Sequence, residues 1–160
     1  MVSAPASPAA LANARRRPSV AIVYHFFAHY RAAVMVELAR NGRCGWTLVG
    51  DEGDYESDIR AWRPPDDVAF RVGKCRRIAR SIMWQSGVVG LAVGSDFDAL
   101  VMLGNANWPA TWLAAIIARL RGKRVFFWTH GWITPPNGLK GTFRNTFYRL
   151  ANGLLLYGHL

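Results

Sequence analysis

The stretch ALVMLGNANWPATWLAAIIARLRGKRVFFWTHGW, residues 99–132, carries the clearest secondary-structure pattern in the chain. Ala99–Leu103 is a continuous apolar run, which is typical of a strand buried on both faces of a parallel sheet. Pro109 stands where the first turn of a helix is expected, and that helix should run to Arg121. Lys123–Trp128 is a second apolar run, rich in aromatic residues. The stretch therefore predicts a β-α-β unit.

The same alternation of strands and helices extends over most of the chain. Apolar residues at helical spacing predict helices at Tyr30–Arg40 and Leu139–Leu150, and apolar composition predicts another over Ile78–Val93. Further strands are expected at Ser19–His25, Trp46–Gly50, Val68–Val72 and Leu154–Tyr157. Such an alternation predicts an α/β fold: a Rossmann-like parallel sheet of about six strands with helices on both faces.

The chain has 160 residues, the length of one ordinary domain. Residues 1–18 are rich in Ala, Ser and Pro and are expected to form a disordered tail, which leaves residues 19–160 for the domain. No apolar stretch reaches the roughly 20 residues that a membrane-spanning helix needs. Cys44 and Cys75 show neither metal-ligand spacing nor a disulfide framework. We expect them to be reduced thiols of a cytoplasmic protein.

The formal net charge is +10, and its distribution along the chain is uneven. Carboxylates cluster between Asp51 and Asp67, and none follows Asp98. A basic second half suits phosphates, nucleic acid or an anionic membrane leaflet, and a solvated surface without a partner explains it equally well. No recognised RNA or DNA motif accompanies the charge, so nucleic acid is not an expected partner.

Ligands of open α/β sheets bind beyond the carboxyl ends of the strands, and polar residues follow several of the expected strands. These residues are His25, His29, Tyr30, Arg31, Asp51, Gly104, Asn105, Asn107, Thr129, His130, Gly131 and His159. All 4 histidines of the chain are among them. Histidine donates hydrogen bonds and exchanges protons near neutral pH. His130, at a sharp strand exit, is the best functional candidate, whereas His25 and His159 are interpreted as structural.

Several classes of site do not fit the sequence. The turn after the first strand, Tyr24–Tyr30, has no glycine, so the dinucleotide-binding G-x-G-x-x-G is absent, and no phosphate-binding P-loop is present. The carboxylates crowd one loop, which disfavours glycoside hydrolysis by a pair across a cleft. Imidazoles with Asp51 could hold a metal ion, but no two share a helix at i, i+4 spacing, and no metal is expected. Asn107 could cap the helix that begins near Pro109.

Four segments resemble a known family: YHFFAHYR (24–31), LGNANWPATWL (103–113), ARLRGKRVFFWTHGW (118–132) and FYRLANGLLLYGH (147–159). They are similar to the N-terminal domain of family 4-type glycosyltransferases, with bacterial exopolysaccharide enzymes as the nearest type. The resemblance runs from Ser19 to the end and is most specific over Leu103–His159.

The resemblance implies one half of a GT-B fold, in which two Rossmann-like domains face each other across a cleft. The N-terminal half mostly binds the acceptor, a glycan or a lipid-linked glycan, and the C-terminal half binds the nucleotide-sugar donor. Transfer is typically retaining and metal-independent. No cofactor is implied beyond the nucleotide-sugar co-substrate.

In such enzymes a histidine after a late strand contacts the sugar or acceptor, and His130 matches it. The other expected acceptor-binding or cleft residues are His29, Tyr30, Arg31, Asn105, Asn107, Thr129, Gly131 and Trp132. The glutamates that hold the donor are missing, so the donor residues are unknown. We expect a truncated chain that is inactive alone and needs a C-terminal donor domain, in the same or another chain.

Basic residues are interleaved with apolar ones in two segments, around Lys74–Arg80 and around Lys140–Arg149. This pattern suits peripheral attachment to the inner face of the plasma membrane. Phe143 and Phe147 are nevertheless typical of a core stripe. The alternative function is a non-catalytic membrane-docking or regulatory binding module.

Overall fold

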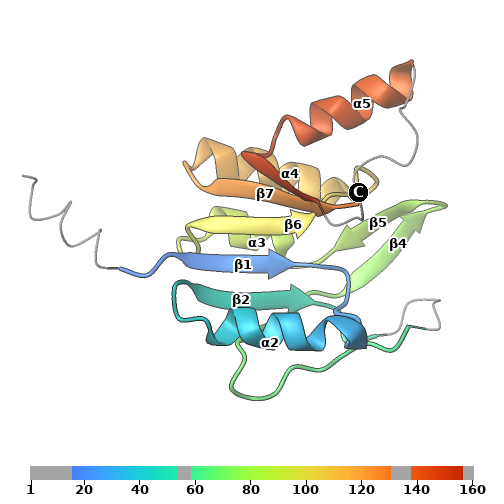
Figure 1. The fold of residues 1–160 in the computed structure, drawn as a ribbon. Coiled ribbons are helices and arrows are strands. Elements are labelled where there is room, and N and C mark those ends of the chain that lie inside the picture. Colours follow the sequence, from blue (N-terminus) through green and yellow to red (C-terminus); the bar gives the residue numbers. More distant parts are fainter. Residues whose placement is uncertain (1–15, 54–58, 131–137, 157–160) are drawn as a thin grey trace, which may run out of the picture.

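The computed structural model describes residues 16–53, 59–130 and 138–156 (Figure 1). Most of the expected N-terminal tail, residues 1–15, lies outside these ranges, and within the remainder Arg16 forms an ion pair with Asp98. None of the described helices is both long and apolar enough to span a membrane.

The centre of the fold is a six-stranded parallel sheet with the order β3-β2-β1-β6-β7-β8. Its strands are β1 (Ser19–Val23), β2 (Gly45–Gly50), β3 (Phe70–Val72), β6 (Ala99–Leu103), β7 (Arg124–Thr129) and β8 (Gly153–Leu156). Counted within this sheet alone, the order is 3-2-1-4-5-6, that of a doubly wound Rossmann-like sheet. The α/β prediction is therefore confirmed.

The β-α-β unit of residues 99–129 forms as its sequence predicts. Helix α4 (Pro109–Leu120) begins with Pro109 in its first turn and connects β6 to the parallel strand β7. Its inner side carries Ala110, Ala114 and Ala118, all 0% exposed. These small side chains let the helix axis approach the sheet closely. Gly122, with φ of 74°, ends the unit's helix in a left-handed turn.

Helices cover both faces of the sheet (Figure 1). On one face, α3 (Val88–Val93), α4 and α5 (Leu139–Tyr148) pack on a core that includes Leu100 and Phe127. On the other face, a 3-10 turn, η1 (His29–Arg31), leads into α2 (Ala32–Arg40). The fully buried Met35 of α2 joins a second core that contains Ile22 and Leu48.

The helix expected over Ile78–Val93 is wrong in its first half. The chain instead forms an antiparallel hairpin, β4 (Cys75–Ala79) and β5 (Ile82–Gln85), and only Val88–Val93 is helical. Gly87 adopts a φ of 81°, a left-handed conformation that a continuing helix excludes. The buried amide of Gln85 donates to the Tyr24 carbonyl at 2.8 Å and ties the hairpin to the end of β1.

Candidate functional site

A polar hollow of about 260 Å³ lies beyond the carboxyl ends of β1, β6 and β7. We call it the rim hollow, and its walls are Tyr24, Leu103, Gly104, Asn105, Ala106, Asn107, Thr129, His130, Arg144 and Tyr148. The strand order reverses between β1 and β6, and doubly wound sheets bind ligands at this switch point. The rim hollow is therefore the candidate site.

Gly104 brings the loop after β6 against the end of β7. Its backbone N–H donates to the Trp128 carbonyl at 2.9 Å, which continues the pairing of the two strands. A Cβ at this position would lie 2.8 Å from the Cβ of Thr129, closer than side chains approach one another. Only glycine fits here, and its presence places the β6–α4 loop beside Thr129.

The β6–α4 loop is held by its own asparagine and by the neighbouring hairpin. The Asn105 side-chain oxygen accepts the Asn107 N–H at 3.0 Å, and the Asn107 carbonyl accepts the Met83 N–H of β5 at 3.2 Å. The expected capping of α4 by Asn107 is wrong. Trp108 occupies the N-cap position, and no side chain caps this helix end, because the turn closed by Asn105 begins the helix one residue later.

Helix α5 supplies the remaining polar wall. The Tyr148 hydroxyl donates to the Gly104 carbonyl at 3.3 Å and lies 3.4 Å from the Thr129 hydroxyl. With its proton directed to Gly104, the Tyr148 oxygen accepts from Thr129. Arg144 stands one turn earlier on the same helix face and is exposed at the hollow. Imidazole, amide, hydroxyl and guanidinium groups thus converge on one small volume.

The segment His29–Arg31 lies next to the rim hollow without lining it. The Arg31 guanidinium sits 4.9 Å from the Tyr24 ring centre and 5.6 Å from that of Trp128, as a cation over aromatic faces. The His29 Nδ1 lies 3.3 Å from the Arg60 carbonyl oxygen, and Tyr30 is exposed.

The expected site residues therefore form two groups. Asn105, Asn107, Thr129 and His130 meet in the rim hollow, and the η1 segment adjoins them across Tyr24. Gly131 and Trp132 lie outside the described residues, as does His159.

His25 differs from His130 in burial. Its ring packs on Tyr24 and Phe26, with ring centres 4.6 Å apart in both pairs. Burial, aided by the positive charge of Arg31, lowers the pKa of His25 to about 4. Within the described part of the chain its Nδ1 has no hydrogen-bond partner. The imidazole is therefore neutral near pH 7 and suited to packing, not to proton exchange.

Asp51 organises backbone at the end of β2. One carboxylate oxygen accepts the Cys75 N–H at 2.6 Å and the other accepts the Gly53 N–H at 3.1 Å. Burial and the nearby Asp51 carboxylate raise the pKa of the Cys75 thiol to about 12, so this cysteine stays protonated. Among the residues that the structure describes, no three His, Cys, Asp or Glu side chains are grouped so that they could hold a metal ion.

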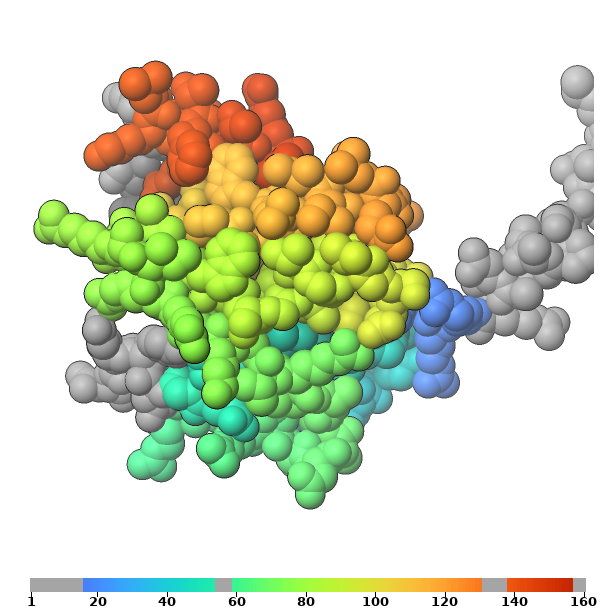
Figure 2. All heavy atoms as spheres, turned by 180° about the vertical axis from the view of Figure 1, so that it is seen from behind, coloured from blue at the N-terminus to red at the C-terminus, as the bar shows by residue number. Residues whose placement is uncertain are grey.

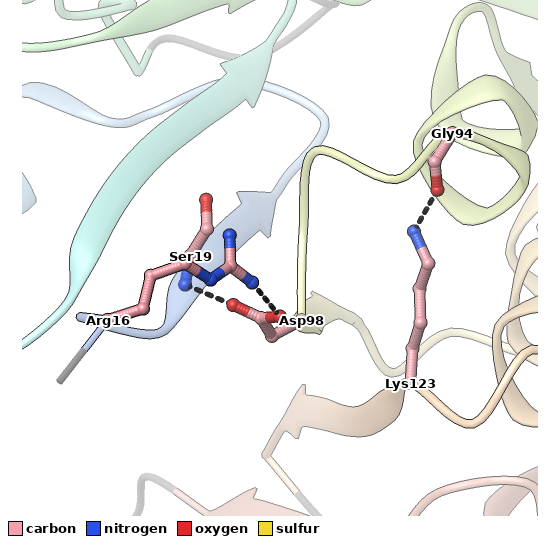
Figure 3. A network of polar contacts seen from close by, with 5 residues as sticks. All are labelled: Arg16, Ser19, Gly94, Asp98 and Lys123. Carbon is pink, nitrogen blue, oxygen red and sulfur yellow. Dashed lines mark hydrogen bonds and ion pairs between the residues drawn. The ribbon is translucent and has the colours of Figure 1, made fainter. Parts of the chain in front are cut away.

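A larger hollow, of about 650 Å³, lies at the opposite edge of the sheet, where β1, β6 and β7 begin. Three of the charged side chains that line it, Arg16, Asp98 and Lys123, have protein partners (Figure 3). Asp98 accepts from Arg16 and from the Ser19 N–H, and the Lys123 ammonium donates to the carbonyls of Leu91 and Gly94. These contacts join the ends of the helix and the strands to one another. The hollow lies at the amino ends of the strands, whereas ligands of open parallel sheets bind at the carboxyl ends.

Three polar residues of the rim hollow were not expected from the sequence: Tyr24, Arg144 and Tyr148. Arg144 and Tyr148 are four residues apart on a predicted helix, a spacing that puts them on one face. Which face of α5 meets the strand ends depends on how that helix packs. Tyr24 lies inside the strand predicted to run to His25, whereas β1 ends at Val23, so the overestimated length of that strand hid Tyr24 from the prediction.

No protein-family model matches the chain, and the comparison with curated proteins and with solved structures also finds no match.

Proposed function

We propose that this chain is the acceptor-side half of a GT-B glycosyltransferase, which moves a sugar from a nucleotide-sugar donor to a glycan or lipid-linked acceptor. The observation that carries the proposal is the rim hollow, a small polar volume at the switch point of a Rossmann-like sheet. All its wall residues except Arg144 lie in the four segments that resemble the family, 24–31, 103–113, 118–132 and 147–159.

The chemistry of the rim hollow suits a hydroxylated acceptor. The side chains of Asn105 and Asn107 are exposed there and offer both donors and acceptors to sugar hydroxyls. The imidazole of His130 can form a hydrogen bond with the acceptor hydroxyl that receives the sugar, or it can accept the proton of that hydroxyl. Arg144 supplies a fixed positive charge, which suits a phosphate on a lipid-linked acceptor.

The proposal assigns the donor to a second Rossmann-like domain, in the same or another polypeptide, with the nucleotide sugar as co-substrate and no other cofactor. The domain described here would provide one wall of the cleft. One wall cannot orient both substrates or exclude water, so the chain alone should transfer no sugar. We place the reaction on the cytoplasmic side, where nucleotide sugars are made.

The test restores the donor half and replaces His130. With the complementary domain supplied, we expect His130→Ala to lower the rate of nucleoside diphosphate release by about a hundredfold or more, because the group that contacts the reacting hydroxyl is lost. The thermal unfolding midpoint should not change, since His130 is exposed. Arg124→Ala, at the other end of the same strand, is the matched control and should keep the parental rate. Equal rates for the parent and His130→Ala would exclude His130 from the reaction.

A binding measurement on the chain alone tests the acceptor side separately. Neutral oligosaccharides should perturb the backbone NMR signals of residues 104–107 and 129–130 and leave those of residues 121–124 unchanged. Perturbations confined to residues 121–124 would move the ligand site to the opposite sheet edge and contradict the proposal.

A further inference from the structure

An apolar groove of about 600 Å³ lies on the outside of the molecule between helix α4, helix α5 and the β4–β5 hairpin. Its walls are Ser81, Ile82, Ala106, Asn107, Pro109, Trp112, Leu113, Ile116 and Phe143. Figure 2 shows this side of the molecule, with the hairpin in green, α4 in yellow to orange and α5 in red-orange above it. The proposed sugar transfer does not use this groove.

The groove exists because α4 is apolar on both its sides. Its inner alanines pack on the sheet, yet Leu113 and Ile116 face outward and are 43% and 41% exposed. Phe143 on the facing helix is 53% exposed. A helix that is apolar all round is usually covered on every side. The exposed side of α4 is therefore suited to contact with another apolar phase.

The groove is held open by fixed contacts. The Trp112 indole N–H donates to the Ala106 carbonyl at 2.9 Å, which fixes the ring at the base of α4. The same ring packs on Phe143 at 4.8 Å between ring centres, so α4 and α5 are held together at this point. On the other side, the backbone bond from Met83 to Asn107 holds the hairpin against the start of α4. The shape therefore does not need a partner to form.

The segments that form the groove carry positive charges and no negative ones. The exposed Lys140 and Arg144 of α5 line an adjoining hollow that shares Phe143 with the groove. On the hairpin side, the exposed Arg80 directly precedes Ser81, which lines the groove. The sequence has no Asp or Glu between Asp67 and Asp96 and none after Asp98. An apolar strip with cations beside it complements a surface that presents anionic groups above an apolar layer.

We propose that the apolar groove and its basic borders dock on the surface of an anionic lipid bilayer. Ile82, Ile116 and Phe143 would enter the boundary between headgroups and acyl chains, while the arginines and lysines on both sides contact the lipid phosphates. Docking goes beyond the proposed sugar transfer and does not depend on it.

The groove is continuous with the candidate site. A third hollow, of about 410 Å³, is lined by Ser81, Ala106, Asn107, Lys140, Phe143 and Arg144. It shares Asn107 and Phe143 with the apolar groove, and Asn107 and Arg144 with the rim hollow. Docking would therefore bring the membrane interface next to the rim hollow, where a membrane-anchored headgroup could reach His130.

Sedimentation of the chain with lipid vesicles tests the proposal. Vesicles of phosphatidylcholine mixed with phosphatidylglycerol should bind the chain at least ten times more tightly than vesicles of phosphatidylcholine alone, and added salt should weaken the binding. The double variant Leu113→Ser/Ile116→Ser, at two exposed side chains of the groove, should bind at least ten times more weakly than the parent, and so should Arg80→Glu/Lys140→Glu. All four side chains are exposed, so circular dichroism should show an unchanged fold.

Two controls separate the groove from general charge and general hydrophobicity. Leu120→Ser removes an apolar side chain that is 82% exposed and outside the groove, and Arg124→Glu reverses a charge at the far edge of the sheet. Both should bind within about twofold of the parent. If the serine variant binds like the parent, the groove does not enter the bilayer and the proposal is wrong. No binding to anionic vesicles, with capture of an acidic amphipathic peptide instead, would assign the groove to a protein partner and also overturn it.

Fluorescence quenching tests whether the groove itself contacts the membrane. Lipids brominated on their acyl chains should quench part of the fluorescence of the bound chain, and Trp112→Phe should remove most of that quenching because Trp112 lines the groove. Quenching that is unchanged in Trp112→Phe would place another part of the molecule at the membrane. Neither readout requires sugar transfer, so failure of docking and failure of the transferase proposal are distinguishable.

Discussion

His25 follows β1 and His130 follows β7, at the same edge of the sheet, but their surroundings differ. His25 is packed between aromatic rings beside Arg31, which leaves its imidazole neutral. His130 is exposed in the rim hollow. The sequence distinguished them only by their neighbours, since Gly131 follows His130 and aromatic residues flank His25. The burial and the charge that lower the pKa of His25 come from residues that pack around it in three dimensions.

The lowered pKa of His25 predicts a pH-dependent stability. The pKa of His25 is 6.5 in the unfolded chain and about 4 in the folded chain. Between pH 6.5 and pH 4 the unfolded chain therefore binds a proton at His25 that the folded chain does not bind. The contribution of the neutral His25 to the free energy of unfolding is therefore fully present above pH 6.5 and is lost as the pH falls toward 4. We expect the free energy of unfolding to drop by about 3 kcal/mol over this window. Urea unfolding at pH 7 and pH 4 measures it, with each protein referred to its own value at pH 7. His25→Gln should show a drop smaller by that amount, and equal drops would contradict the prediction.

At the scale of elements, the bounds of the six sheet strands and of helices α2, α4 and α5 were predicted to within two residues, because their signals are local. The hairpin β4–β5 was not. Residues 78–85 are apolar enough for a helix, but their side chains do not enter either core of the domain. Ser81 and Ile82 line the outer groove instead, and the left-handed Gly87 separates the hairpin from α3. An apolar composition predicts burial, but by itself it does not distinguish a helix from a hairpin.

The carbonyl groups at the end of helix α3 are capped by a side chain from another part of the chain, so replacing that side chain should lower the stability. The buried Lys123 donates its ammonium hydrogens to the carbonyls of Leu91 and Gly94 at the end of α3. Figure 3 shows the contact with Gly94. Lys123→Met keeps the aliphatic packing but leaves these carbonyls without the donor. We expect the free energy of unfolding to fall by about 2 kcal/mol in urea titrations. Arg124→Met removes the same charge from an exposed neighbour and should change it by less than about 0.5 kcal/mol. Equal effects would show that net charge, not the cap, is responsible.

At the scale of the whole molecule, the candidate site is assembled from elements that are far apart in the sequence. The rim hollow joins residues after β1, β6 and β7 to helix α5, and the sequence predicted the strand ends because parallel strands share one carboxyl edge. It could not predict Arg144 and Tyr148, because their position depends on the orientation of α5. That orientation is set mainly by Phe147, which is 0% exposed and stacks on Phe127 of β7 at 4.3 Å. Of the stripe predicted for this helix, Phe147 is buried as expected, whereas Phe143 and Leu139 are exposed.

The attachment of α5 through Phe147 predicts how the molecule comes apart. Phe147→Ala removes the ring that stacks on Phe127 and contacts Trp112, and should lower the free energy of unfolding by about 3–5 kcal/mol. Amide hydrogen exchange should then accelerate first in residues 139–148 and 153–156, because α5 and the edge strand β8 open before the centre of the sheet. Leu139→Ala, at a side chain of the same helix that is 89% exposed, should leave exchange in β8 unchanged. Since α5 carries Arg144 and Tyr148, Phe147→Ala should also weaken any ligand of the rim hollow while β1 and β6 remain protected. A uniform loss of protection across β1, β6 and α5 would instead show that the helix and the sheet unfold as one unit.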